Sequence, residues 1–247
     1  MDIEFIGRNR NKKKIVCTIS KEKIRVILKE HHLKPWREKM WCIPNLNDEY
    51  IQRMEDVLDT YEKPYNEKEP VVCLDEKPIQ LLADARTLKP ARKPGEITKR
   101  DYEYKRHGTA NVFCGIEPKA GKHFTKVTEN RKAPEFAQML EDIATEYPEA
   151  TTIHLILDNL NTHRIKSCIT HFGIEAGHAL WNRFTVHYTP KHASWLDQAE
   201  IEIGIYSRQC LGKTRTASIE DLIRKSTAWN LAVNQKKLKI NWGFTND

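Results

Sequence analysis

The sequence lacks the features that mark a membrane or secreted protein. No apolar run approaches the roughly 18 residues that a membrane-spanning helix requires. The opening residues, MDIEFIGRNRNKKK, have no apolar stretch between their charges, so no secretory signal is expected. The six cysteines lie far apart and form no Cys-x-x-Cys pair, which argues against a zinc ribbon. Scattered thiols are typical of a reducing compartment, and we expect a cytoplasmic protein.

Repeats and low-complexity tracts are also absent. Hydrophobic residues make up 39% of the 247 residues, with 6 Trp, 8 Tyr and 7 Phe. This composition supports a packed core and excludes wholesale disorder. The length suits either one large domain or one domain with a smaller appendage.

The formal net charge of +7 is unevenly distributed. Residues 1–40 contain 12 Lys and Arg against 5 Asp and Glu, and residues 204–247 contain 8 against 3. The segment between them is therefore net acidic. Basic ends predict a polyanionic partner, and an acidic middle predicts a bound cation. An ordinary solvated surface could have the same distribution of charged residues. Charge alone therefore does not decide between such a surface and a protein that binds a polyanion and a cation.

Apolar periodicity predicts a mixed sheet covered by helices. A meander of strands comes first, and strands then alternate with helices, an order that is typical of an α/β fold. The predicted helices are 20–33, 48–65, 133–148, 163–172, 193–211 and 217–234. The predicted strands are 71–76, 78–85 (pairing back on the first), 102–107, 109–118, 122–130, 151–158 and 183–189, with turns at Gly108 and Gly121.

Three acidic residues lie at the ends of predicted strands or within a predicted helix that follows them. Asp75 ends the first predicted strand, Asp158 ends the strand of LILDNLNTH, and Glu200 lies in the predicted helix 193–211. If the two strands are parallel neighbours, both aspartates emerge at the same edge of the sheet, where a helix can bring Glu200 beside them. Three close carboxylates repel one another unless cations lie between them. Oxygen ligands suit Mg²⁺ or Mn²⁺, and two such ions about 4 Å apart can promote phosphoryl displacement.

These acids alone leave several functions open. A single aspartate at a strand end is more often a helix cap or a turn former. The set of three points to metal-dependent phosphoryl chemistry, but it does not distinguish a nuclease from a polymerase or a phosphatase.

Several longer stretches carry a family resemblance. They resemble the catalytic domain of mariner-like DDE transposases, specifically the bacterial insertion-sequence branch, over about residues 20–247. The stretches are VVCLDEKPIQLL, DYEYKRHGTANVF, LILDNLNTH, HYTPKHASWLDQAEIEIGIYSRQCL and INWGFT. The resemblance implies a ribonuclease-H-like fold, metal-dependent cleavage at transposon ends, and strand transfer into target DNA, typically at a TA dinucleotide.

The resemblance also assigns the catalytic acids. Asp75 and Asp158 match the first two acids of the family's triad, and Glu200 matches the third. The separations are 83 and 42 residues, and the second is long for this family, which implies an insertion around 173–182. Asp197 and Glu202 compete with Glu200. Helical geometry places Asp197 on nearly the same face as Glu200, whereas Glu202 points elsewhere.

The resemblance further implies two domains. Residues 67–247 would form the ribonuclease-H-like catalytic domain, and residues 1–66 a helical DNA-binding remnant with a linker. Such transposases usually begin with tandem helix-turn-helix units, of which only the basic region 20–43 resembles a part. We therefore expect a shortened chain whose ability to recognise transposon ends is in question.

Residues close to the acids are candidates for DNA binding. Asn159 and His163 follow Asp158 and would either orient its carboxylate or contact the scissile phosphate, unless they merely cap the loop. Lys77 lies two residues after Asp75 on the same strand face, where either a phosphate contact or a solvated lysine is expected.

Basic and aromatic residues elsewhere extend this list. Lys191 and Trp195 precede Glu200 and would hold a bent or flipped DNA strand by charge and stacking, although core packing is the commoner role for a tryptophan. Arg92 and Lys93 lie in the basic loop RTLKPARKPGEITKR and would follow phosphates.

The sequence thus predicts a DDE transposase that uses two Mg²⁺ or Mn²⁺ ions. Its partners would be double-stranded DNA, both transposon ends and target, and a second copy of the chain in a homodimer. No membrane and no small-molecule substrate are expected, and the protein would be cytoplasmic and nucleoid-associated in a bacterium. The alternatives are a ribonuclease-H-like nuclease that cuts without joining, and a non-catalytic DNA-binding remnant.

Overall fold

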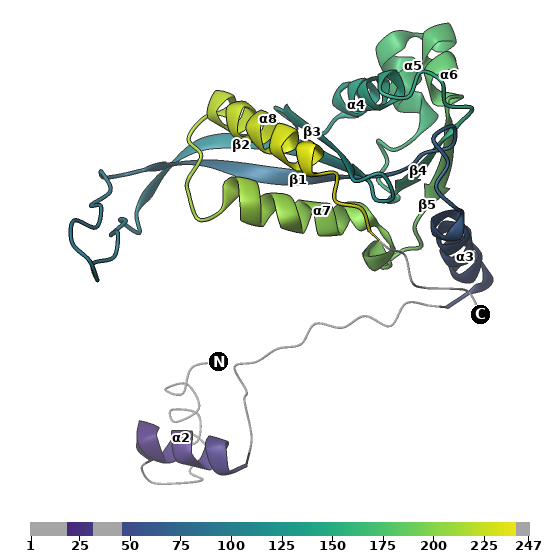
Figure 1. The fold of residues 1–247 in the computed structure, drawn as a ribbon. Coiled ribbons are helices and arrows are strands. Elements are labelled where there is room, and N and C mark those ends of the chain that lie inside the picture. Colours follow the sequence, from purple (N-terminus) through teal and green to yellow (C-terminus); the bar gives the residue numbers. More distant parts are fainter. Residues whose placement is uncertain (1–18, 32–45, 241–247) are drawn as a thin grey trace. The chain divides into compact units, whose positions relative to one another are not determined.

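The computed structural model describes residues 19–31 and 46–240 (Figure 1). The chain divides into two compact units, residues 1–43 and 44–247. In the first unit, helix α2 (Lys21–Glu30) begins at Ser20, whose hydroxyl oxygen accepts a hydrogen bond from the Lys23 N–H at 3.1 Å. This helix and its N-cap were predicted from the sequence.

The second unit is built on a five-stranded mixed sheet. The strands are β1 (Val71–Asp84), β2 (Tyr104–Glu117), β3 (Lys122–Thr128), β4 (Ile153–Leu157) and β5 (Phe184–Tyr188), in the order β3-β2-β1-β4-β5. The first three strands form an antiparallel meander, and β4 and β5 continue the sheet in parallel with β1. The predicted mixed sheet is confirmed.

Helices cover both faces of this sheet (Figure 1). One face packs against α4 (Ala133–Thr145), α5 (Ile165–Phe172) and α6 (Ile174–Trp181). The other packs against α3 (Asp48–Glu62) and α7 (Gln198–Tyr206), and α8 (Ile219–Lys236) packs beside α7 and along β3. Helix α6 occupies the segment that the sequence marked as an insertion. The predicted helix 193–211 is three pieces: η1 (Ser194–Leu196), α7, and a π-helical turn η2 (Ser207–Leu211).

Two local predictions about the meander are wrong. Residues 71–76 and 78–85 do not pair with each other, because they are one continuous strand, β1. Pro78 is tolerated there because β4 pairs only with Val71–Cys73, so that edge of β1 has no strand partner at Pro78. Gly108 is not a turn: it lies within β2, at φ 93°, where the register with β1 shifts. Gly121, at φ 66°, does form the predicted turn between β2 and β3.

Helix α3 belongs to the sheet and not to the N-terminal segment. Its Tyr50, Val57 and Tyr61 are buried in one cluster with Cys73 and Ile156. The predicted domain boundary at residue 66 is therefore too late, because burial of this apolar face ties α3 to the catalytic unit. None of the described helices is both long enough and apolar enough to span a membrane.

A chain of polar groups, the buried His154 and His187 and the exposed Asp56, joins α3 to the sheet. His154 Nδ1 on β4 lies 2.9 Å from His187 Nε2 on β5, and His187 Nδ1 lies 2.8 Å from Asp56 Oδ2 on α3. Burial, together with the nearby charges of Lys63 and His187, lowers the pKa of His154 to about 4 against the opposing effects of Glu69 and Asp56.

This chain predicts acid sensitivity of the fold. The pKa of His154 is lower in the folded than in the unfolded chain, so its contribution to stability is complete above pH about 6.5 and is lost as the pH falls towards 4. Between pH about 7.5 and 5 we expect the free energy of unfolding to fall by about 2 kcal/mol from this residue. Urea unfolding of the wild type and of His154→Gln over this range measures the effect. An equally steep decline in the variant would contradict it.

Candidate functional site

Strand pleating and register place the first two acids together. Along β1, Val71 and Cys73 face the cluster of α3 and α7, so Asp75, two residues on, faces the same side. Cys73 pairs with Ile156 in the parallel ladder to β4. Continuing this register by two residues brings Asp75 beside Asp158, which directly follows β4. One detail of the prediction is wrong: Asp75 does not end β1 but is its fifth residue, at the point where the pairing with β4 ceases.

Helix α7 supplies the third acid. Glu200 lies in the first turn of α7 and is exposed, whereas both of its competitors are buried. Asp197 is the N-cap, and its Oδ1 accepts a hydrogen bond from the Ala199 N–H at 2.8 Å. Glu202 Oε1 lies 2.7 Å from His123 Nδ1, on the other side of the helix. Of these three acids, only Glu200 is exposed to solvent and therefore accessible to a substrate.

The acids influence one another electrostatically. Burial raises the pKa of Asp75 to about 6, and the negative charges of Asp158 and Glu200 contribute to the rise. Burial likewise raises the pKa of Asp197 well above its usual range, with contributions from the same acids. Asp158 and Glu200 thus disfavour ionisation of both Asp75 and Asp197.

A buried histidine fixes the orientation of Asp158. His163 Nδ1 lies 2.7 Å from Asp158 Oδ1, and Nε2 lies 2.6 Å from Glu76 Oε1. The imidazole is fully buried and stacks on Phe136 at a centroid distance of 4.7 Å. Burial by itself would lower the pKa of His163, but the hydrogen bonds to both carboxylates outweigh it and raise the pKa to about 9. The ring therefore donates from both nitrogens at neutral pH.

This burial decides between the two roles predicted for His163. A contact with DNA is excluded, since the ring has no exposed surface, and the side chain instead orients the Asp158 carboxylate. Burial raises the pKa of Asp158, but hydrogen bonds from His163 and from the Leu160 N–H, at 2.9 Å, outweigh this and lower it. Asp158 is thus held as a carboxylate.

Asn159 is held from two sides. Its Oδ1 accepts a hydrogen bond from Arg53 Nη1 at 2.5 Å, and its Nδ2 donates to the Thr189 carbonyl oxygen at 2.6 Å. These contacts join the loop after Asp158 to helix α3 and to the end of β5. Asn159 therefore has a structural role, whether or not it also contacts DNA.

The other predicted DNA-binding residues are accessible. Lys77 is half-buried on β1, and Arg92, Lys93 and Lys191 are exposed. Trp195 is 62% exposed on η1, so the alternative that it packs in the core is wrong.

The three acids fit a divalent cation by their chemistry. They are oxygen donors whose mutual repulsion a cation would relieve. In the residues that the structure describes, no group of three Asp, Glu, His or Cys side chains is gathered closely enough to enclose an ion as it stands. Asp75 Oδ1 accepts a hydrogen bond from the Glu76 N–H at 2.7 Å, and Asp158 Oδ1 takes the bonds described above. In both residues the described hydrogen bonds fall on Oδ1, which leaves Oδ2 for a cation.

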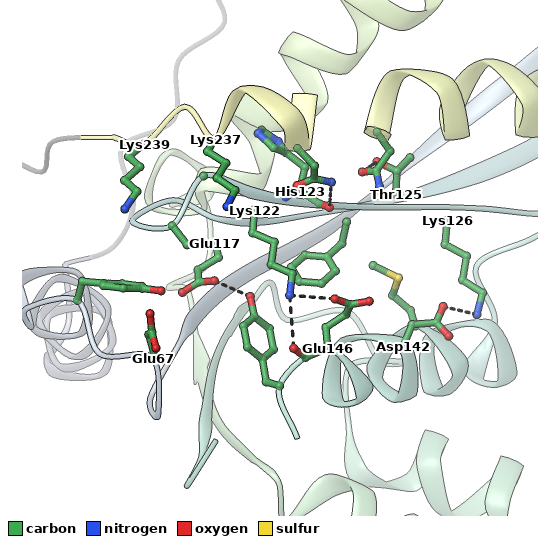
Figure 2. Close-up of a pocket in the computed structure, with 18 residues that line it drawn as sticks. Glu67, Glu117, Lys122, His123, Thr125, Lys126, Asp142, Glu146, Lys237 and Lys239 are labelled. Atoms are coloured by element: carbon green, nitrogen blue, oxygen red, sulfur yellow. Dashed lines mark hydrogen bonds and ion pairs between the residues drawn. The ribbon is translucent and has the colours of Figure 1, made fainter. Parts of the chain in front are cut away.

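A cavity of about 810 Å³ lies elsewhere, along β3 between α4 and α8 (Figure 2). None of the three acids lines it. Four of its charged side chains form two ion pairs: Lys122 with Glu146 at 3.0 Å, and Lys126 with Asp142 at 2.7 Å. Because none of the three acids lines the cavity, its size alone does not make it the catalytic centre.

Sequence reasoning missed Glu76 and Arg53. The alternation of residues along β1 did point to Glu76. Val72 and Leu74 pack against α4, and Glu76 is the next residue on the same core-facing side of the strand. An acid at such a position requires a buried partner. No local sequence pattern indicated a role for Arg53, because its hydrogen-bond partner Asn159 lies 106 residues away in the chain.

Comparisons with known proteins identify the family and the fold of the chain. Residues 70–223 match the family model described as DDE superfamily endonuclease. The fold is similar to that of the Mos1 mariner paired-end complex with Mn, with a TM-score of 0.54 and 16% identity over 89% of this chain and 67% of that chain. The Mos1 strand transfer complex gives a TM-score of 0.53 and 14% identity over 96% and 75%. No curated protein sequence matches the chain. The predicted ribonuclease-H-like fold is confirmed.

Proposed function

Because this chain belongs to the DDE superfamily of endonucleases, we propose that it is a transposase that cuts DNA at transposon ends and joins them to a target. The observation that carries the proposal is the convergence of Asp75 and Asp158 on one face of the sheet with Glu200 on the helix that covers it. The finer assignment, to the bacterial insertion-sequence branch of mariner-like transposases, rests on the sequence resemblance.

Asp75, Asp158 and Glu200 would hold two Mg²⁺ or Mn²⁺ ions. Mos1 complexes have been solved with Mn and with Mg, which supports this choice of cation. When bound, the ions would activate the attacking water or 3′-hydroxyl and stabilise the leaving oxygen.

The chain's own residues prepare the site for this chemistry. His163 and the Leu160 N–H keep Asp158 ionised and fix its direction, so that little reorganisation is needed when a cation binds. Because Glu200 is exposed, its carboxylate would be accessible to a cation that also meets a phosphodiester approaching from solvent. Arg53 and Thr189 hold Asn159 and thereby fix the loop that carries Asp158.

Double-stranded DNA is the proposed partner. Mos1 has been solved as complexes with transposon ends, and this supports transposon ends and target DNA as substrates here. Contacts are proposed from the accessible residues Lys77, Arg92, Lys93, Lys191 and Trp195. A homodimer would bring two ends together, and residues 1–43, with helix α2, would be the remnant of an end-reading module.

A cleavage assay tests this function. Duplexes carrying the inverted repeats that flank the coding sequence are incubated with the protein, a plasmid target, and either Mg²⁺, Mn²⁺ or EDTA. We expect nicks at the repeat ends and joined products with either metal, and neither product with EDTA, because the acids need a cation to act. Nicks without joining would identify a simple nuclease. Specific binding without any cleavage would identify a non-catalytic remnant.

A further inference from the structure

The helix that carries Glu200 buries an acid while it leaves an isoleucine exposed. The buried residues of α7 are Ala199, Glu202 and Tyr206, which lie on one face at helical spacing. Ile201 lies one residue before Glu202 and is 56% exposed. Burial of an isoleucine stabilises a fold, whereas burial of a carboxyl group costs free energy unless it is hydrogen-bonded. The rotation of α7 about its axis is therefore not the one that burial of apolar surface alone would select.

A turn of α7 by one residue would give the helix a more apolar buried face. Consecutive helical residues lie about 100° apart around the axis, so such a turn would place Ile201 where Glu202 lies. Glu200 would then take the direction of Ile201, which lines a cavity of about 220 Å³ that none of the three acids lines. The third acid would thus turn away from the other two.

In the observed rotation, Glu200 follows a residue that packs beside the other two acids. Ala199 is buried in one cluster with Cys73 on β1 and Ile156 on β4. Each of these two strand residues lies two positions before an aspartate of the proposed site. The direction in which Glu200 points therefore depends on how α7 is seated on this part of the sheet.

His123 on β3 supplies the hydrogen-bond partner that holds Glu202 inward. Its Nδ1 lies 2.7 Å from Glu202 Oε1, and the two side chains are 8% and 2% exposed. The Asn234 side chain of α8 accepts a hydrogen bond from the His123 N–H at 2.8 Å and donates one to the His123 carbonyl oxygen at 2.9 Å. Trp229, also on α8, packs edge-on against the imidazole at a centroid distance of 6.0 Å. The imidazole is thus a fixed partner, and the observed rotation of α7 is the one that brings Glu202 to it.

We propose that the Glu202–His123 pair sets the rotation of α7 and thereby directs Glu200 towards the other two acids. A single buried polar contact can specify the register of a helix at a cost in stability. Glu202 and His123 are positioning residues, because they act through Glu200 and need no contact with DNA or a cation. The inference rests on the proposed function and adds to it the residues that orient the third acid.

Replacement of both partners by leucine tests this role. Glu202→Leu combined with His123→Leu, here called the leucine pair, removes donor and acceptor together, so the urea midpoint should stay unchanged or rise. Cleavage of transposon-end DNA with Mg²⁺ should nevertheless slow about 10-fold, because Glu200 is no longer held in the reactive direction. Addition of Ile201→Gln should restore cleavage to within about twofold of the wild-type rate, because a polar residue disfavours burial of the competing face.

Maleimide labelling measures the rotation without DNA or metal. Ile201→Cys places a thiol at an exposed position. The tryptic peptide 192–208 contains no native cysteine, so mass spectrometry reads this thiol alone. Labelling should be several-fold slower beside the leucine pair than beside the native pair, because residue 201 turns inward.

The matched control is Glu117→Leu combined with Tyr147→Phe. It removes a hydrogen bond of 2.6 Å from a buried acid on β2, at the cavity of Figure 2, and should change neither cleavage nor labelling.

The two measurements separate the possible failures. Unchanged labelling beside the leucine pair, whatever the urea midpoint, would overturn the positioning role and leave the transposase proposal intact. Slower labelling with cleavage at the wild-type rate would overturn it as well, because the rotation would then not direct Glu200. Absence of cleavage by the wild type would overturn the transposase proposal, and labelling would still decide whether the pair sets the rotation.

Discussion

Asp158→Ala is expected to reduce metal-dependent DNA cleavage by roughly 1,000-fold. The substitution removes one of the three carboxylates that would hold the cations, and about 4 kcal/mol of lost charge stabilisation in the transition state corresponds to this factor. Nicking of transposon-end duplexes with Mg²⁺, under single-turnover conditions, measures the loss. Asp158→Asn should be as defective, because the amide keeps the shape of the side chain and removes its charge.

Folding should survive the loss of Asp158. Its side chain is 48% exposed, and His163 keeps its second carboxylate partner, Glu76. Thermal unfolding checks this point. Asp142→Ala is the matched control, because the exposed Asp142 pairs with half-buried Lys126 at the cavity in Figure 2, which none of the three acids lines. Cleavage at the wild-type rate by folded Asp158→Ala would refute the catalytic assignment.

His163→Ala is expected to lower the free energy of unfolding by about 3–5 kcal/mol. Glu76 is buried with its carboxylate 2.6 Å from His163 Nε2, so removing the imidazole leaves a buried charge without that partner. The substitution also opens a void against Phe136. Urea unfolding at neutral pH measures the loss, and His178→Ala, an exposed histidine on α6, should change stability by less than about 0.5 kcal/mol.

A double variant separates the buried charge from the void. Glu76→Leu combined with His163→Ala removes the buried carboxylate and keeps the void against Phe136, and it should recover at least half of the stability lost in His163→Ala. If the double variant is as unstable as the single one, the void and not the unpaired carboxylate dominates. A loss below about 1 kcal/mol in His163→Ala itself would show that the pair contributes little.

The acids were recognisable from the sequence because their signals are local. Apolar runs that are interrupted at Asp75 and Asp158, and a helical segment that carries Glu200, are visible in the order of residues alone. Alternation along β1 also fixed which side chains share a face. The resemblance to DDE transposases then gave the three acids a proposed common role.

Other features depended on partners distant in the chain. The sequence predicted two short strands where β1 is continuous, because the tolerance of Pro78 depends on where β4 stops pairing. It also assigned α3 to the wrong domain, since the amphipathic pattern of a helix shows that a face is buried but not against what.

The order of residues therefore determined most of the helices and strands and the candidate catalytic acids. Tertiary structure decided that Glu200, rather than buried Asp197 or Glu202, is presented at the site, and that His163 is held between Glu76 and Asp158. The physical reason is that periodicity and capping act over a few residues, whereas burial and ion pairing are set by whichever distant segment packs alongside.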